Sequence, residues 1–480
     1  MNLVVTSGHL AGIIVTLAGV TLVGLYAGRK VKSAGDFQIG GRRAGAAVVA
    51  GAIMGTLIGG SSTIGTAQMA FKYGLCAWWF TLGSGIGCAV LGLGLARRVR
   101  KAPLHTVPQY LSLNYGKGIG LIACAVAFVC SGLGILAQGL SGVALLSSMF
   151  KVNPLTAAGI CVFLVLGFVV FGGVWGAGLV GVFKTSLVYL AVVAGGVLAY
   201  YLIGGQAGLL ALFPSYPWFS FFGRGFNQDF ALGLSMLVGT LSSQYYIQAI
   251  YAGKSLADAR RGALISAVLI PPVGLGGVLI GLYMRANFPD VSSAQVLPLF
   301  VINHLPPVLA GVALAALLVT VIGTWAGITL GISTILTRDI YKQYIRPGAE
   351  DNKMLLIQRL IILVVCLLSV PIIAGSAGTM IMGWVTLSMI MQSSSTLLPL
   401  LGAIFLPRLV TPPAAALSAF LGPLTVVIWH ALFPGGLSPI YPGLLVSLLT
   451  ISLVSLVSRR AWPAGAGIAP ENNTRETGTF

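Results

Sequence analysis

The sequence predicts an all-α polytopic membrane protein with about thirteen transmembrane helices. Of the 480 residues, 57% are hydrophobic and only 8% are charged. Long apolar runs follow one another, each near the roughly 20 residues that cross a bilayer, so most of the surface must face lipid. The expected spans are residues 7–27, 45–71, 76–96, 119–148, 154–173, 177–203, 228–252, 262–285, 305–336, 355–375, 379–405, 412–433 and 440–458.

Basic residues predict the orientation of these spans. Of the 27 Lys and Arg residues, 22 lie in the loops after the first, third, seventh, ninth, eleventh and last spans. By the positive-inside rule those loops are cytoplasmic. The protein is then expected in the plasma membrane, with its N-terminus outside the cell and its C-terminus in the cytoplasm. This placement accounts for the net charge of +18 without nucleic acid as a partner. No Lys or Arg precedes the first apolar run, so we interpret it as a retained helix and not a signal peptide.

The whole of residues 1–461 is expected to form one transmembrane transporter domain. Residues 462–480 are rich in Gly, Pro and polar residues and too short to fold alone, so they are expected to form a short disordered cytoplasmic tail. The six cysteines lie in spans or at their edges without metal-ligand spacing, which predicts small buried hydrophobic residues.

The second span contains the most informative segment, residues 54–68, in which glycines and hydroxyls replace the expected apolar residues. Glycine lowers the cost of leaving helical geometry, and lipid offers no hydrogen bonds to the peptide groups that a break frees. Irregular backbone at this depth therefore predicts a lined cavity, such as the substrate and ion sites of secondary transporters.

A similar segment, residues 238–248, interrupts the seventh span, and its Gly239-Thr240-Leu241 repeats Gly55-Thr56-Leu57. An offset of five spans reverses the direction of the helix. This predicts two inverted repeats, about residues 45–203 and 228–405. The alternative is a pair of glycine-rich packing helices.

Three motifs support the repeat. Residues 36–42 (DFQIGGR), 248–261 (QAIYAGKSLADARR) and 337–342 (TRDIYK) resemble loop and helix-end signatures of the sodium/solute symporter family, which includes bacterial proline, galactose and sialic acid symporters. The resemblance covers nearly the whole chain. It implies a leucine-transporter-like fold of five plus five inverted helices, with helices two and seven broken. The implied function is sodium-coupled symport of a small organic solute by alternating access.

The resemblance also implies a sodium site between the first broken helix and the ninth span. The backbone carbonyls of Gly55, Ile58 and Thr320 and a pair of hydroxyls at positions 323 and 324 would hold the ion. Here the pair is Gly323 and Thr324, so one hydroxyl is missing. The Thr320 hydroxyl, one turn away on the same face, can compensate. The alternative is a seam of small residues that packs two helices together.

Lys184 offers an alternative to sodium as the cation at this site. None of the nine acidic residues falls inside a span, and Leu57 and Gly181 stand where several family members place carboxylates near the ion. Lys184 is the one charged residue well inside a span, where an unpaired ammonium is costly. It could replace sodium and make the carrier sodium-independent, either proton-coupled or a uniporter. It could instead extend to the lipid headgroups, or pair with an anionic substrate.

The substrate is expected to be a small neutral or anionic metabolite, because positive helix ends suit carboxylates. Polar side chains in the broken helices can have structural roles instead of binding this substrate, because Ser and Thr can bond to their own backbone and Trp and Tyr can anchor the membrane interface. The expected partners are this solute, sodium and the lipid bilayer, with no other cofactor and no obligate protein partner. The candidate substrate-binding residues are Ser61, Ser62, Thr63, Gln68, Gln244, Tyr245, Tyr246, Gln248 and Trp78.

Two other classes of function fit the sequence less well. A membrane-embedded enzyme needs a nucleophile, an acid-base pair or a metal cluster. In the sequence, none of the four histidines has neighbours that would form such a group. A channel needs pore-lining rings or a repeated filter segment. Two non-identical broken helices fit a carrier better.

Overall fold

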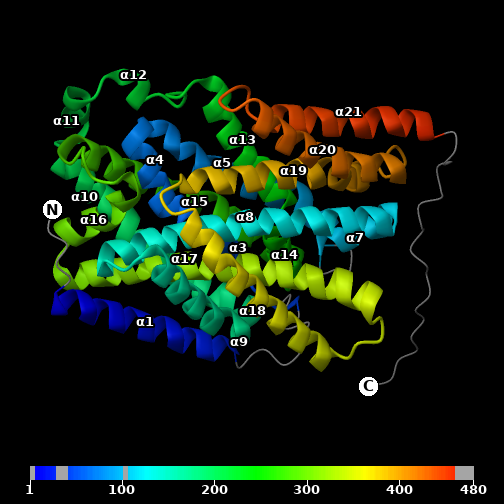
Figure 1. Ribbon diagram of the computed structural model, residues 1–480, viewed down its shortest axis with the longest axis horizontal. Helices are drawn as coiled ribbons and strands as arrows, with labels where there is room; N and C mark the ends of the chain where they lie inside the picture. The colour runs from blue at the N-terminus through cyan, green and yellow to red at the C-terminus, as the bar shows by residue number, and fades with distance from the viewer. Residues whose placement is uncertain (1–5, 29–41, 101–105, 460–480) are drawn as a thin grey trace.

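A computed structural model describes residues 6–28, 42–100 and 106–459, and these ranges consist of helices joined by loops. The only β-bridge within them joins Ala44 to Gly253. Figure 1 shows long helices lying side by side, with α1 and α21 at opposite edges of the bundle. Residues 36–41 of the first family-like motif and the predicted tail, 462–480, lie outside the described residues.

The first half of the bundle contains these α-helices: α1 Ser7–Gly28, α3 Ala46–Leu57, α4 Thr66–Tyr73, α5 Trp79–Val90, α6 Ala96–Val99, α7 Val107–Tyr115, α8 Lys117–Phe150, α9 Pro154–Val188, α10 Ala194–Leu202, α11 Gly205–Leu212 and α12 Ser215–Trp218. The second half contains α13 Phe226–Ser242, α14 Gln244–Ala252, α15 Leu256–Asn287, α16 Val296–His304, α17 Pro307–Ile335, α18 Asp351–Gly375, α19 Ile381–Phe405, α20 Pro412–Leu432 and α21 Ile440–Ser458. Short π-helical turns, among them Ser61–Gly65 and Tyr189–Val193, connect some of these helices.

Both predicted helix breaks are confirmed. Helix α3 ends at Leu57, and Ile58 has extended backbone angles (φ −81°, ψ 91°) before the chain resumes in a π-helical turn and α4. Helix α13 ends at Ser242, and Ser243 is extended (φ −81°, ψ 134°) before α14 begins. Each break leaves peptide groups without helical partners inside the bundle.

The boundaries of the predicted spans agree less well with the helix ends in the structure than the predicted breaks do. One continuous helix, α9, covers the predicted fifth span and the beginning of the sixth. By length and composition, nine helices in the described ranges could cross a membrane, and three shorter apolar helices accompany them. The multi-pass membrane class is confirmed, whereas the count of thirteen spans stays a prediction.

Helix α17 is the centre of the bundle. In its most apolar window 83% of the residues are buried, against 22% in α18 and 28% in α21, whose leucines face outward as lipid-facing side chains do. Helix α17 packs against α1, α3, α8 and α9. This position places Thr320 and Thr324 next to the break in the first broken helix. We call the end of the bundle where α1 begins the outer end, and the opposite end the inner end.

Candidate ion and substrate site

The break after α3 is stabilised by hydrogen bonds to its freed amides. The amide of Gly59 donates to Ser62 Oγ (2.9 Å), and the amide of Gly60 donates to Gln138 Oε1 on α8 (2.8 Å). A Cβ atom at Gly60 would lie 2.2 Å from the Cβ of Ser141, so glycine is needed for α8 to come this close. The break is therefore a built feature of the fold.

The carbonyl groups freed by the same break point toward α17. The hydroxyl of Thr324 lies 3.1 Å from the carbonyl oxygen of Gly55 and 3.1 Å from that of Ile58. The predicted ion-binding residues thus meet at one place. We call the group formed by Gly55, Ile58, Thr320, Gly323 and Thr324 the cation site.

The amino group of Lys184 occupies the cation site. Its Nζ donates to the carbonyl oxygen of Gly55, to that of Thr320 (3.1 Å) and to Thr324 Oγ1 (3.1 Å). Lys184 is only 1% exposed, so its side chain does not extend to the membrane surface. Three oxygen acceptors match the three donors of an ammonium.

Two glycines make room for this arrangement. A Cβ atom at Gly323 would lie 3.2 Å from Lys184 Nζ and 3.3 Å from its Cδ, so the space left by the missing family hydroxyl is filled by the lysine. A Cβ atom at Gly181, one turn before Lys184 on α9, would lie 2.0 Å from the carbonyl oxygen of Gly51. Because α9 and α3 touch there, a carboxylate side chain has no space at position 181.

The amino group of Lys184 lies in the cation site without an acidic partner among the described residues. The only acceptors bonded to Lys184 among the described residues are two carbonyls and one hydroxyl. Hydrogen bonds to a charged group contribute about 1.5–3 kcal/mol each, and they offset the cost of burying the ammonium. The hydroxyl of Thr320 is buried there without a hydrogen-bond partner.

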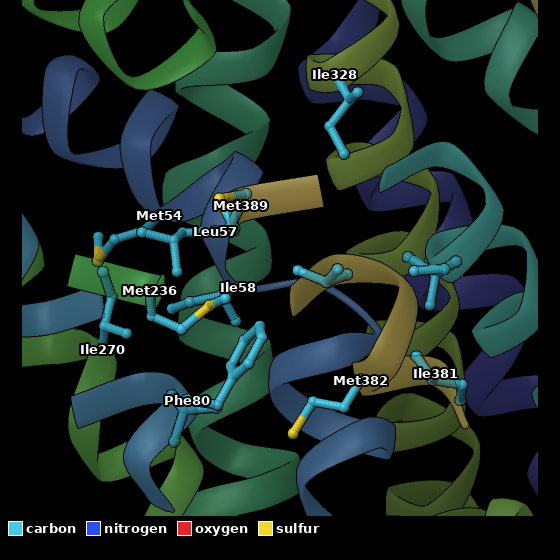
Figure 2. Packing of buried hydrophobic residues seen from close by; sticks show 14 of the residues in the cluster. Met54, Leu57, Ile58, Phe80, Met236, Ile270, Ile328, Ile381, Met382 and Met389 are labelled. Atoms are coloured by element: carbon cyan, nitrogen blue, oxygen red, sulfur yellow. The ribbon is translucent and has the colours of Figure 1, made fainter. Parts of the chain in front are cut away.

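A small cavity lies beside the cation site, and residues next to both helix breaks line it. This midplane cavity has a volume of about 20 Å³, enough for a single water molecule. Figure 2 shows Leu57, Phe80 and Met236, three of its lining residues, gathered around the break in the first broken helix. Solute binding here requires these apolar side chains to move apart. The lining consists of Thr56, Leu57, Ser61, Phe80, Ser84, Gly134, Gln138, Met236, Thr240, Tyr245, Tyr246, Thr324, Ile328, Val385 and Met389.

Three of the predicted substrate-binding residues, Ser61, Tyr245 and Tyr246, line the midplane cavity. Ser62 and Thr63 instead bond to the carbonyl of Gly59 and close the broken turn.

The remaining four predicted residues lie away from the midplane cavity. Trp78 donates to the carbonyl of Pro271 (2.9 Å), and Gln68 is buried with its Oε1 unpaired. Gln244 accepts a bond from the amide of Val107 (2.8 Å). Gln248 lines another small cavity toward the inner end.

Sequence reasoning missed Gln138, although its amide bonds both to the break and to Ser61 Oγ (3.3 Å). One signal was present, since Gln138 is the only amide side chain in the apolar helix α8. Thr240 and Ser84 were missed because single hydroxyls are ordinary in membrane helices and usually bond to the preceding turn, as both do here.

Comparison with known proteins identifies the family to which these features belong. The model of the sodium:solute symporter family matches residues 37–422. The chain belongs to this family. Its members are sodium-coupled transporters and not enzymes, so at the level of the family the predicted class, sodium-coupled symport of a small solute, is confirmed.

Curated relatives match this symporter over nearly their full length. The high-affinity proline transporter PutP of Bacillus subtilis is 25% identical, over 91% of this chain and 96% of the relative. The sodium/proline symporter of Haemophilus influenzae is 24% identical, over 92% and 93%.

Solved structures share the fold of this symporter. A sodium-coupled sialic acid symporter in a substrate-bound, outward-open state superposes with a TM-score of 0.79 at 17% identity, over 95% of this chain and 98% of that one. Mhp1, a nucleobase-cation-symport-1 family transporter, has a TM-score of 0.57 at 12% identity, over 88% and 94%. The leucine-transporter-like fold is thereby confirmed.

The inner end of the symporter is held closed by contacts between distant segments. The hydroxyl of Thr106, which caps α7, donates to the buried carboxylate of Asp339 (2.7 Å). The side-chain oxygen of Gln244, the first residue of α14, accepts a hydrogen bond from the backbone amide of Val107, the first residue of α7. The amide of Ala44 donates to the carbonyl of Ala252 (3.0 Å), and the amide of Lys254 donates to the carbonyl of Ala44 (2.8 Å).

The outer end contains a much larger space. A cavity of about 290 Å³ lies between the outer parts of α4, α13, α19 and α20. We call it the outer cavity. With the inner end held closed, this arrangement matches a carrier that is open at one end only, the end where α1 begins.

Proposed function

We propose that this chain carries a small neutral or anionic metabolite across the cell membrane by alternating access, with sodium as the coupling ion at the cation site. The observation that carries the proposal is the convergence of the freed carbonyls of Gly55 and Ile58 with the hydroxyl of Thr324. Several oxygens at an unwound helix end are what a hard cation needs. The N-terminus would lie outside the cell and the C-terminus inside, as the placement of basic residues predicts.

Sodium binding at this site requires the ammonium of Lys184 to leave. Both cations would use the Gly55 and Thr320 carbonyls and the Thr324 hydroxyl, so the site holds one of them at a time. The family's ion and this chain's lysine therefore compete. Exchange between them would link sodium binding to a movement of the Lys184 side chain.

A second candidate function is supported by the position of Lys184 itself. Its amino group already fills the cation site and is 1% exposed. If it stays there through the cycle, the carrier is sodium-independent, and a proton on the amine, or no ion, accompanies the solute.

Thermal unfolding in matched sodium and potassium chloride distinguishes the two candidates. A ligand that binds only the folded state stabilises it by about 2.7 kcal/mol at a hundred times its dissociation constant. Sodium coupling predicts a sodium-specific rise in Tm that Thr324→Ala abolishes. The second candidate predicts no rise in the parent protein and a new sodium response in Lys184→Gln.

The neighbouring variant Thr185→Val is a matched control. The Thr185 hydroxyl is buried and bonds only to the preceding turn of α9, at Gly181 O (2.7 Å), so its loss should leave the sodium response unchanged. No sodium response in the parent, Lys184→Gln or Thr185→Val would contradict ion binding at this site.

Proline is the first solute to test for transport, because the curated relatives are named proline transporters. The assay is uptake of labelled proline into proteoliposomes, with inward gradients of sodium or protons. Uptake driven by sodium favours the first candidate, and uptake driven only by protons favours the second. If proline does not enter, counterflow with small neutral and anionic metabolites identifies the solute.

A further inference from the structure

The outer cavity differs from the midplane cavity by its size and its chemistry. Its volume is about 290 Å³, whereas the midplane cavity measures about 20 Å³. A space of this size holds a small organic molecule. It is lined by Met69, Tyr73, Arg224, Gln228, Ala231, Leu232, Met380, Met382, Gly383, Thr386, Leu387, Ile390, His430, Ser438 and Pro439.

Arg224, in the wall of this cavity, is positioned by contacts with the buried carboxylate of Asp229. Its Nε donates to Asp229 Oδ1 (2.7 Å), and its backbone amide donates to Asp229 Oδ2 (2.8 Å). The side chain of Asp229 is 0% exposed, whereas that of Arg224 is 21% exposed. The guanidinium also lies 5.6 Å from the ring centre of Tyr73. The carboxylate therefore positions the arginine and is itself hidden from the cavity.

This anchoring uses only one edge of the guanidinium. The hydrogen bond from the Arg224 side chain to Asp229 goes through Nε. The guanidinium also lies near the thiol of Cys76, and its terminal nitrogens carry the donors that a ligand would use. A guanidinium fork matches a carboxylate in two parallel hydrogen bonds.

The rest of the lining fits a small organic anion. Arg224 is accompanied by the imidazole of His430, and neither Asp nor Glu is among the lining residues. No carboxylate of the lining therefore repels an incoming anion. Met380 offers partly exposed apolar surface to the remainder of the ligand, and the flexible side chains of Met69 and Met382 lie buried behind the lining.

We propose that the outer cavity is a binding site for a small organic carboxylate, held by Arg224 and by the surrounding methionines. The inference rests on the proposed transport function and narrows its substrate class from neutral or anionic to anionic. Helix α19 lines both cavities, because Leu387 and Ile390 line the outer cavity while Val385 and Met389 line the midplane cavity. A solute captured at Arg224 lies next to the route inward.

Equilibrium dialysis of radiolabelled benzoate against the purified full-length protein tests this site. Benzoate has a carboxylate and an apolar ring, and benzamide is nearly the same shape without the charge. The dialysis is done in potassium chloride, in the absence of sodium. We expect saturable benzoate binding that unlabelled benzoate displaces and benzamide does not.

The double variant Arg224→Gln/Asp229→Asn removes the fork without leaving a buried carboxylate unpaired, and it should lower benzoate affinity at least tenfold. The control is Arg285→Gln, which removes another cation near the outer end that packs on Phe71 and does not line the cavity. This control should bind benzoate as the parent does.

Three outcomes would overturn the proposal: no benzoate binding by a folded parent protein, equal binding of benzamide, or unchanged affinity in the double variant. A sodium response of the parent, measured by thermal unfolding, separates this failure from failure of sodium coupling. Benzoate binding without a sodium response overturns sodium coupling alone. A sodium response without benzoate binding overturns the anion site alone.

Discussion

The amino group of Lys184 and the hydroxyl of Thr324 lie 3.1 Å apart, although the residues are 140 positions apart in the chain. The same hydroxyl lies within hydrogen-bonding distance of two carbonyls of the broken helix α3. Thr324 therefore connects α17 to both α9 and the break. A side chain in this position controls both the stability of the break and the acceptors around the ammonium.

Removing the Thr324 hydroxyl should destabilise the folded protein. Thr324→Val keeps the shape but takes an acceptor from Lys184 and a donor from the carbonyls of Gly55 and Ile58. An unpaired buried group costs about 1–3 kcal/mol, so Tm should fall in thermal unfolding without sodium. Thr324→Ser keeps the hydroxyl and should stay closer to the parent. A Val variant as stable as the Ser variant would show that these bonds do not contribute.

Restoring a hydroxyl at position 323 should depend on Lys184. Gly323→Ser places a Cβ 3.2 Å from Lys184 Nζ, and overpacking of a core costs about 1–3 kcal/mol. In a Lys184→Ala background the space is free, so the same substitution should be tolerated and should supply the second hydroxyl to sodium. A double-mutant cycle of unfolding free energies should give a coupling above about 0.5 kcal/mol. Additive effects would argue against shared space.

Gly181→Ala should disrupt the contact between α9 and α3. Its Cβ would lie 2.0 Å from the carbonyl oxygen of Gly51, so one of the two helices must shift. We expect a loss of about 3 kcal/mol of stability, measured by thermal unfolding. Gly159→Ala, on the same helix with nothing within 4 Å of the added Cβ, should be neutral or stabilising by up to about 1 kcal/mol. Equal behaviour of both variants would contradict the close approach.

Breaking the Thr106–Asp339 bond should loosen the inner end. Thr106→Val removes the hydroxyl that bonds the buried carboxylate, whereas Thr106→Ser keeps it. The thiol of Cys124, 3.9 Å from Asp339 Oδ2, reports opening there. A loss of about 1.4 kcal/mol corresponds to a tenfold change, so mass mapping should find maleimide labelling of Cys124 about tenfold faster in the Val variant. Identical rates in the Val and Ser variants would mean that this bond does not hold the inner end closed.

Stability of the outer end should fall in mild acid because of His304 on α16. Burial lowers the pKa of His304, and its ring nitrogens contact Tyr283 Oη (2.8 Å) and the carbonyl of Phe300 (3.1 Å). The unfolded state then binds more protons between the lowered pKa and the usual value near 6.5, so stability decreases as pH falls through that window. The decrease in Tm from pH 7.5 to pH 5.5, a range chosen to cover roughly this window, should be smaller in His304→Gln. An equal decrease in both proteins would exclude His304 as the cause.

Both helix breaks could be predicted from the sequence, because a run of glycines and hydroxyls inside an apolar span has few structural explanations. The position of the Lys184 amino group could not be predicted in this way. Its position along a helix suggests both a path to the headgroups and a path to the cation site, and only the packing of α9 against α3 at Gly181 selects between them. Gln138 lies on a different helix from the break it caps, and sequence alone does not pair residues so far apart. The junction between the fifth and sixth spans could not be placed, because apolar composition runs through both and α9 continues across the predicted boundary.

The stem of Lys184 attaches its charge permanently to the carrier, and this has an electrical consequence. A free ion bound with the solute is released on the far side and adds its charge to the current in every cycle. A membrane voltage contributes about 2.3 kcal/mol per charge at 100 mV to such a movement. An ammonium that remains at the cation site goes back with the empty carrier, so the voltage does no net work on it. For a solute of given charge, the net charge moved in each cycle therefore depends on whether sodium or a permanently protonated Lys184 occupies the same few oxygens.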